Sequence, residues 1–211
     1  MLIGDVRLNV IIDWQLAAGR GLAETVRLVL VGGAGLIQYR DKTGSAREQL
    51  AMLAALLPLC RAAAVPLVVN DRVDLALAAG ADGVHVGQND LTVQDARRLL
   101  GPSAIIGCSA TTPTEAQQAV AAGADYLGVG PVFATPTKTD TGRPGGLALV
   151  RQVAALALPV PWFVIGGIQP DTLAAVLAAG AQRIAVVSAV MAAADPQAAA
   201  AALLARVQGG S

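Results

Sequence analysis

Three polar side chains alternate along the stretch "QYRDK", where an apolar run ends. Gln38, Arg40 and Lys42 are two positions apart, so in an extended strand they share one face, and Tyr39 and Asp41 share the other. Two cations and an amide on the inward face of a strand are unfavourable unless a ligand or a pairing network compensates them. We therefore expect this face to bind an anionic ligand, with an internal ion-pair network as the alternative.

Two carboxylates follow the next two apolar runs. Asp71 comes after "PLVVN" and Asp90 after "GVHVG". Carboxylates on neighbouring loops suit Mg²⁺, which keeps several waters and completes its shell with phosphate oxygens. We predict that Asp71 and Asp90 hold Mg²⁺; the alternative for Asp71 is a helix N-cap for "RVDLALAAG". Because the chain has one histidine, His85, and two scattered cysteines, Cys60 and Cys108, the sequence predicts no zinc site.

Small and hydroxylated residues nearer the C-terminus suit a phosphate group. Gly167 follows an apolar run, and Ser188, preceded by Val187, begins a short helical pattern. Glycine lets backbone N–H groups approach an anion closely, and a helix N-terminus favours negative charge. The connection over 130–146, "GPVFATPTKTDTGRPGG", adds hydroxyls and Lys138, and loops of this length are usually functional or disordered. A phosphate site at this corner and a second anion site beside the predicted metal suggest a diphosphate.

Apolar, β-branched runs alternate with Ala/Leu-rich helical runs along the whole chain. This pattern implies βαβ units and a parallel sheet. Eight such units in 211 residues predict an α/β fold, a (β/α)8 TIM barrel forming a single domain over 1–211, with an open doubly wound sheet as the alternative. The glycines of "VGGAGL", "AAGADG", "AAGADY" and "AAGAQR" predict left-handed helix C-caps. The strand candidates are 7–13, 35–40, 66–70, 83–87, 104–109, 125–130, 161–167 and 183–188.

Composition argues against several functional classes. Lys+Arg and Asp+Glu are balanced, with a net charge of +0 and no basic run, which argues against nucleic acid as a partner. The apolar stretches are too short to span a bilayer. Asp5 and Arg7 interrupt the N-terminal apolar region, so no signal peptide is predicted. The two separated cysteines are typical of reduced thiols. We expect a soluble, cytoplasmic protein with no membrane partner; homo-oligomers are compatible with the sequence, which does not indicate a state.

The motifs occur as an ordered set: "QYRDK", "NDRVDLALAAGADGVHVGQNDL", "GCSATT", "GPVFATPTK", "IGGI" and "VVSAV". In order and spacing they resemble the motifs of the thiamine-phosphate synthase family, from about Asn9 to Met191. Single motifs such as "IGGI" are shared by many phosphate-binding barrels, whereas the ordered set is specific. The resemblance implies a Mg²⁺-dependent transferase of thiamine biosynthesis. Its partners would be two small phosphorylated substrates, an aminopyrimidine diphosphate and a thiazole phosphate, which it joins into thiamine phosphate with release of diphosphate.

The resemblance also implies a role for each candidate residue. Asp71 and Asp90 would hold Mg²⁺. Stabilising the departing diphosphate would fall to Lys138, Ser109 and Arg40, in a dissociative substitution that needs charge stabilisation and alignment and no suitably placed histidine. The pyrimidine diphosphate would be bound by Gln38, Arg40, Lys42, Asn70, Ser109 and Lys138. The thiazole phosphate would be bound by Thr135, Pro136, Thr137, Gly167, Val187 and Ser188.

Three other functions remain as alternatives. A thiazole tautomerase-like isomerase of the same barrel family would carry an acid/base histidine where this chain has Pro131. An aldolase-type barrel would need a desolvated Schiff-base lysine on a strand, whereas Lys42 follows two charged residues and Lys138 is in a polar loop. A non-catalytic phosphate-binding barrel would not require the pair of Asp71 and Asp90.

Overall fold

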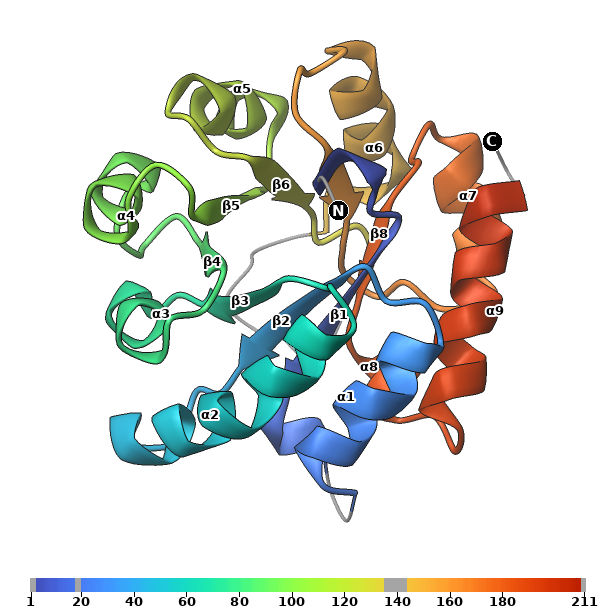
Figure 1. Cartoon of the computed structure of the whole chain (residues 1–211). Helices are drawn as coiled ribbons and strands as arrows, with labels where there is room; N and C mark the ends of the chain where they lie inside the picture. The colour runs from blue at the N-terminus through green and yellow to red at the C-terminus, as the bar shows by residue number, and fades with distance from the viewer. Residues whose placement is uncertain (1–2, 18–19, 135–143, 210–211) are drawn as a thin grey trace.

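A computed structural model of the chain describes residues 3–17, 20–134 and 144–209. Within them, eight parallel strands close into a barrel in chain order, and the last strand pairs with the first (Figure 1). The predicted (β/α)8 barrel is therefore confirmed, and the open doubly wound alternative is wrong. The strands are β1 Leu8–Asp13, β2 Leu36–Arg40, β3 Leu67–Asn70, β4 Gly83–Val86, β5 Ile105–Ala110, β6 Tyr126–Val129, β7 Trp162–Val164 and β8 Ile184–Val186.

Helices surround the barrel on its outer side (Figure 1). Their ends follow local sequence signals: Ser45 and Glu48 form a capping box at the start of α2, and Gly80 ends α3 with φ +63°. The helices are α1 Leu22–Val31, α2 Ala46–Ala62, α3 Val73–Ala79, α4 Val93–Leu100, α5 Pro113–Ala121, α6 Gly146–Ala155, α7 Leu173–Ala178, α8 Ser188–Met191 and α9 Pro196–Gly209, with short 3-10 turns at Ile3–Asp5 and Trp14–Leu16.

No described helix combines the length and the apolar character needed to cross a membrane.

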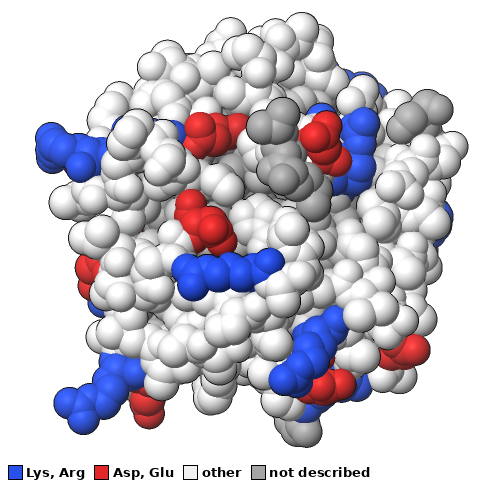
Figure 2. All heavy atoms as spheres, viewed as in Figure 1, with Lys and Arg blue, Asp and Glu red and all other residues white. Residues whose placement is uncertain are grey.

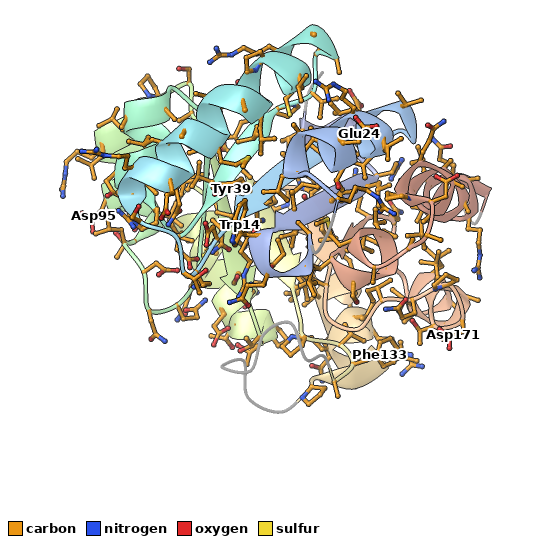
Figure 3. The ribbon with its side chains drawn as sticks, turned by 90° about the horizontal axis from the view of Figure 1, so that it is seen from below. Trp14, Glu24, Tyr39, Asp95, Phe133 and Asp171 are labelled. Carbon is orange, nitrogen blue, oxygen red and sulfur yellow. The ribbon has the colours of Figure 1, made fainter. Side chains whose placement is uncertain are left out.

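Strand alternation separates the two apolar clusters of the fold. The larger cluster fills the space between the helices and the barrel and includes Tyr39, which lies on the side of β2 that faces α2 (Figure 3). The smaller cluster fills the barrel interior and includes Leu36, Tyr126 and Phe163. Because side chains alternate along a strand, Gln38 points to the face opposite Tyr39, and it lines a pocket at the barrel mouth. The predicted division into two faces is confirmed for Gln38, Tyr39 and Arg40, whereas Lys42 follows the end of β2 and is not part of the pocket lining.

Two glycines leave room in the barrel interior for a polar pair. A Cβ at Gly107 would lie 2.2 Å from Cζ of Tyr126 and 2.5 Å from Nδ1 of His85, and a Cβ at Gly128 would lie 3.1 Å from Cε1 of His85. Side chains at these positions would displace both rings. The glycines of β5 and β6 therefore position His85 and Tyr126 beneath the pocket.

The repeated "AAGAD" phrases have a structural role. Asp82 accepts a hydrogen bond from the N–H of Leu67 (2.8 Å), and Asp125 accepts one from the N–H of Ile106 (2.7 Å), so each acid secures the start of a neighbouring strand. Asp125 also pairs with Arg97. On the face drawn in Figure 2, basic and acidic side chains are interspersed in small groups among uncharged residues. That face therefore carries no broad field of one sign among the described residues.

Candidate active site

A pocket opens where the strands end in their βα-loops. It collects seven of the predicted substrate residues: Gln38, Arg40, Asn70, Ser109, Gly167, Val187 and Ser188. Residues from both predicted substrate sites therefore line one cavity. The described residues Lys42, Asp71 and Asp90 lie outside its lining. Its lining also includes polar residues that the sequence reasoning did not select: Asn9, His85, Thr111 and Tyr126.

Arg40 is held in place by a buried carboxylate. Its Nη1 donates a hydrogen bond to Oδ2 of Asp13, which is only 2 % exposed, and Oδ1 of Asp13 accepts from the N–H of Gln15 at 2.9 Å. The internal ion pair considered as the alternative is therefore present, and Arg40 nonetheless lines the pocket. A guanidinium carries five N–H donors in a rigid fork, so a single bond to Asp13 fixes its direction and leaves donors for an anion.

Asp71 and Asp90 are neighbours at the rim of the mouth. The pKa of Asp90 is raised, chiefly by burial and further by the Asp71 carboxyl. The hydrogen bond from the N–H of Gly87 (2.7 Å to Oδ2) and the charge of Lys42 act in the opposite direction. Lys42 Nζ donates to Oδ2 of Asp71. The N-cap position of α3 is Arg72, with no side-chain cap, so the N-cap alternative for Asp71 is wrong.

This pair of carboxylates fits a divalent cation. Burial is the main cause of the raised pKa of Asp90, and the Asp71 carboxyl adds to it, because two like charges close together disfavour ionisation of both. A bound cation would relieve that repulsion. Among residues 3–17, 20–134 and 144–209, no group of three or more His, Cys, Asp or Glu residues could hold a metal. Mg²⁺ is commonly bound through one or two carboxylates, with waters and substrate phosphates as its remaining ligands. The donor set therefore suits Mg²⁺ better than an ion that needs a protein cage.

Glycine and serine form the corner between β7 and β8. Gly166 and Gly167 have φ values of +100° and +65°, in the left-handed region that glycine adopts readily. Ser188 begins α8, Val187 occupies its N-cap position, and Nε2 of Gln169 donates to Oγ of Ser188 at 3.1 Å. The residues predicted for a phosphate thus lie at adjacent strand ends.

The connection after β6 is anchored beside this corner. The N–H of Phe133 donates to the carbonyl of Gly166 (3.0 Å), and the N–H of Gly146 donates to the carbonyl of Val132 (3.1 Å). Phe133 and Asp171, which follow β6 and β7, lie toward the same end of the molecule (Figure 3). Both ends of the connection are therefore held at the pocket mouth. The predicted residues Thr135, Pro136, Thr137 and Lys138 lie outside the described residues.

The expectation that the site has no suitably placed histidine was wrong. His85 is 8 % exposed and lines the pocket, with Nδ1 3.0 Å from the phenol oxygen of Tyr126 and Nε2 3.0 Å from Oγ of Ser109. The physical reason is strand parity: Val84 and Val86 pack on the helix side of β4, so His85 between them faces the barrel interior. The alternation in "GVHVG" was the signal that could have located it.

Strand β1 adds two polar residues that were also missed. Asp13 orients Arg40 through their ion pair. Asn9 lies four residues earlier on the same face of β1 and lines the pocket, although it is only 2 % exposed. Oδ1 of Asn9 is buried and has no hydrogen-bond partner among the described residues. In "LNVIID", alternation places Asn9 and Asp13 on the inward face of the strand, and this spacing is the signal that could have located them.

Comparison with known proteins identifies the family. A family model described as thiamine monophosphate synthase matches residues 8–190. The chain belongs to this family. Two relatives called thiamine-phosphate synthase, from Roseiflexus castenholzii and Moorella thermoacetica, are 50% and 51% identical to it over 92% of the chain and over 85% and 91% of the relatives.

Solved structures agree with this thiamine monophosphate synthase assignment. One described as thiamine phosphate pyrophosphorylase from Pyrococcus furiosus is 37% identical, covers 98% of both chains and has a TM-score of 0.88. A 3-hexulose-6-phosphate synthase structure, 23% identical with a TM-score of 0.64, shows a shared barrel fold alone.

Proposed function

We propose that this member of the thiamine monophosphate synthase family condenses 4-amino-2-methyl-5-(diphosphooxymethyl)pyrimidine with thiazole phosphate. The products are thiamine phosphate and diphosphate. One observation supports the proposal above the others: the Arg40 guanidinium and a glycine–serine corner line one pocket. The neighbouring carboxylates follow β3 and β4 at the same end of the barrel, with Lys42 beside them. These separate groups suit two different phosphorylated substrates.

The reaction breaks the bond between the pyrimidine methylene carbon and the diphosphate oxygen. The thiazole nitrogen then forms a bond to that carbon, and the electron pair of the broken bond leaves with the diphosphate. Asp71 and Asp90 would hold Mg²⁺, which would supply positive charge to the leaving group. Arg40, directed by Asp13, donates hydrogen bonds to the same phosphate oxygens. Because no proton has to be removed from the attacking nitrogen, the step depends on charge stabilisation and alignment.

The glycine–serine corner positions the second substrate. Its backbone N–H groups and the Ser188 hydroxyl bind the thiazole phosphate, and Gln169 orients that hydroxyl. Holding both substrates in one cavity places the nucleophile next to the carbon that loses diphosphate. In the proposed reaction the connection after β6 contacts these phosphates through Thr135, Pro136, Thr137 and Lys138.

We also propose a cytoplasmic location. A reducing compartment suits the two buried cysteines, which form no disulfide with each other.

A direct assay tests the proposal. The purified protein is incubated with both substrates and Mg²⁺, and thiamine phosphate is followed by its conversion to fluorescent thiochrome. We expect product only when both substrates are present. A parallel incubation with thiazole phosphate tautomers alone tests the isomerase alternative, for which Pro131 in the pocket lining provides no acid or base. Isomerisation without condensation would overturn the proposal.

Replacement of Gly167 by alanine should weaken binding of the thiazole phosphate selectively. A Cβ there would lie 2.8 Å from Cβ of Phe133 and 2.9 Å from the carbonyl oxygen of Ala134, and φ at this position is +65°. Loss of one hydrogen bond to a charged group corresponds to roughly a 10- to 100-fold rise in KM for thiazole phosphate. The KM for pyrimidine diphosphate should change much less.

The matched control for this substitution is Gly123→Ala. Gly123 has φ +91°, but a Cβ there would meet nothing within 4 Å. It carries a similar backbone strain at a site outside the pocket lining. Steady-state kinetics with each substrate varied in turn would compare the variants. Equal rises in both KM values for Gly167→Ala would show that this corner does not bind the thiazole phosphate.

A further inference from the structure

A chain of hydrogen bonds runs from the barrel interior to the pocket. The phenol oxygen of Tyr126 lies 3.0 Å from Nδ1 of His85, and Nε2 of the same imidazole lies 3.0 Å from Oγ of Ser109. Tyr126 is fully buried, with its ring edge-on to Phe163, and Ser109 lines the pocket. Nδ1 thus faces a phenol in the barrel interior, and Nε2 faces a serine at the pocket. The tautomer of His85 decides in which direction each proton in this series of hydrogen bonds points.

Tyr126, at the buried end of this series of hydrogen bonds, sets their direction. Burial raises the pKa of Tyr126 well above its usual value, so the phenol keeps its proton, although a hydrogen bond from Gln38 lowers the pKa in part. A phenol oxygen that accepts from Gln38 uses its own proton to donate to Nδ1 of His85. An imidazole that accepts at Nδ1 is protonated at Nε2 when neutral. Nε2–H then donates to Oγ of Ser109.

We propose that Tyr126 and His85 are positioning residues that make the Ser109 hydroxyl a hydrogen-bond donor to the diphosphate of the pyrimidine substrate. The proposal rests on the proposed function in one respect, the contact between Ser109 and that diphosphate. When Oγ accepts from Nε2–H, the serine proton is directed away from His85 and is available to the pocket. In the opposite tautomer the serine proton would point to His85, and a lone pair would face the anion.

The consequence is a donor that is already oriented before substrate binds. Donors fixed where negative charge develops stabilise a transition state more than donors that must reorient. The leaving diphosphate gains charge as its bond to carbon breaks, so a preoriented hydroxyl affects kcat more than substrate binding. His85 contributes through Ser109 and does not transfer a proton in the reaction.

The tautomer can be measured without any activity assay. The chain contains a single histidine, so untagged protein labelled with ¹⁵N-histidine gives one pair of ring-nitrogen resonances. We expect Nε2 to have the shift of a protonated ring nitrogen and Nδ1 that of an unprotonated one. The reverse assignment would overturn the proposal even if the protein makes thiamine phosphate. An inactive protein with the expected tautomer would instead count against the proposed function.

Tyr126→Phe tests the direction of the chain. Without the phenol donor, the shift difference between the two nitrogens should shrink, and kcat should fall by about tenfold, the effect of one weakened hydrogen bond. The matched control is Tyr39→Phe, because Tyr39 is an equally buried tyrosine on the helix side of β2. This control should leave the His85 spectrum unchanged and kcat within about twofold. An unchanged tautomer and rate in Tyr126→Phe would contradict the proposal.

A double-mutant cycle tests whether His85 acts through Ser109. Ser109→Ala should lower kcat by about 10²-fold, the effect of removing one preorganised donor. His85→Gln should lower kcat by less, and His85→Gln combined with Ser109→Ala should be no slower than Ser109→Ala alone, because the serine is the group that contacts substrate. Losses that multiply would show that His85 has a role of its own and would overturn the positioning assignment.

Discussion

Asp90→Asn is expected to lower kcat/KM by more than about 100-fold and to remove its dependence on Mg²⁺. Changing partners that merely orient metal ligands typically reduces activity 10- to 100-fold, and a direct ligand should have a larger effect. Asparagine keeps an oxygen that can accept from the N–H of Gly87, which Asp90 now accepts at 2.7 Å. It also removes a buried charge that lies beside Asp71, since burial first and the Asp71 carboxyl second raise the pKa of Asp90. The folded structure should therefore persist.

The control for this variant is Asp95→Asn. Asp95 lies five residues further along the chain, and its carboxylate pairs with Arg98 on the exposed side of α4, with nitrogen and oxygen 2.6 Å apart. Turnover of Asp95→Asn should match that of the unchanged protein across a Mg²⁺ titration, and thermal unfolding should show all proteins folded. Full Mg²⁺-dependent activity in Asp90→Asn would show that the metal is held elsewhere.

Lys138→Ala is expected to lower kcat by about 10²- to 10³-fold, with a smaller effect on pyrimidine diphosphate binding. This prediction comes from the sequence, because Lys138 lies outside the described residues. Structural support comes from the neighbouring residues: the N–H of Phe133 donates to the carbonyl of Gly166 at 3.0 Å, which anchors the connection after β6 at the pocket mouth. In the proposed reaction the Lys138 cation interacts most strongly with the diphosphate as the charge on the diphosphate increases.

Two further variants sharpen this test. Lys138→Arg should recover part of the rate, since a planar guanidinium does not replace a compact ammonium. Arg151→Ala removes an exposed cation from α6, the helix that follows the connection, and should leave kcat unchanged. Single-turnover measurements would separate the chemical step from product release. Near-normal turnover in Lys138→Ala would count against a rate set by diphosphate departure.

The strands and helices could be predicted because the chain repeats strong local signals. Eight apolar runs alternate with helical runs, and the predicted strand boundaries agree with the structure to within a few residues, as for β2 at Leu36–Arg40 and β4 at Gly83–Val86. Closure of the sheet followed from the number of units and the size of the chain. The structure adds the pairing of β8 with β1, which depends on contacts between distant residues.

Site residues could be predicted where a polar side chain stood in an alternating pattern at the end of an apolar run. They were missed where a single polar residue stood among apolar ones. Gln38 and Arg40 were selected because alternating polar residues end an apolar run. The side chains of His85 and Asp13 also point into the barrel. However, His85 lies inside the apolar strand β4, and Asp13 is the last residue of the apolar strand β1. Their roles depend on partners from other strands, Tyr126 and Arg40, which no local pattern reveals.

The most direct test of the proposed function is a Mg²⁺-dependent product balance. Both substrates are supplied to EDTA-treated protein, Mg²⁺ is titrated in, and diphosphate and thiamine phosphate are quantified in the same samples. We predict that the two products form in equal amounts, that neither forms without Mg²⁺, and that Asp90→Asn forms neither at the Mg²⁺ concentrations that saturate the unchanged protein. Thiamine phosphate formed at full rate without a divalent cation, or diphosphate released without thiamine phosphate, would contradict condensation at this site.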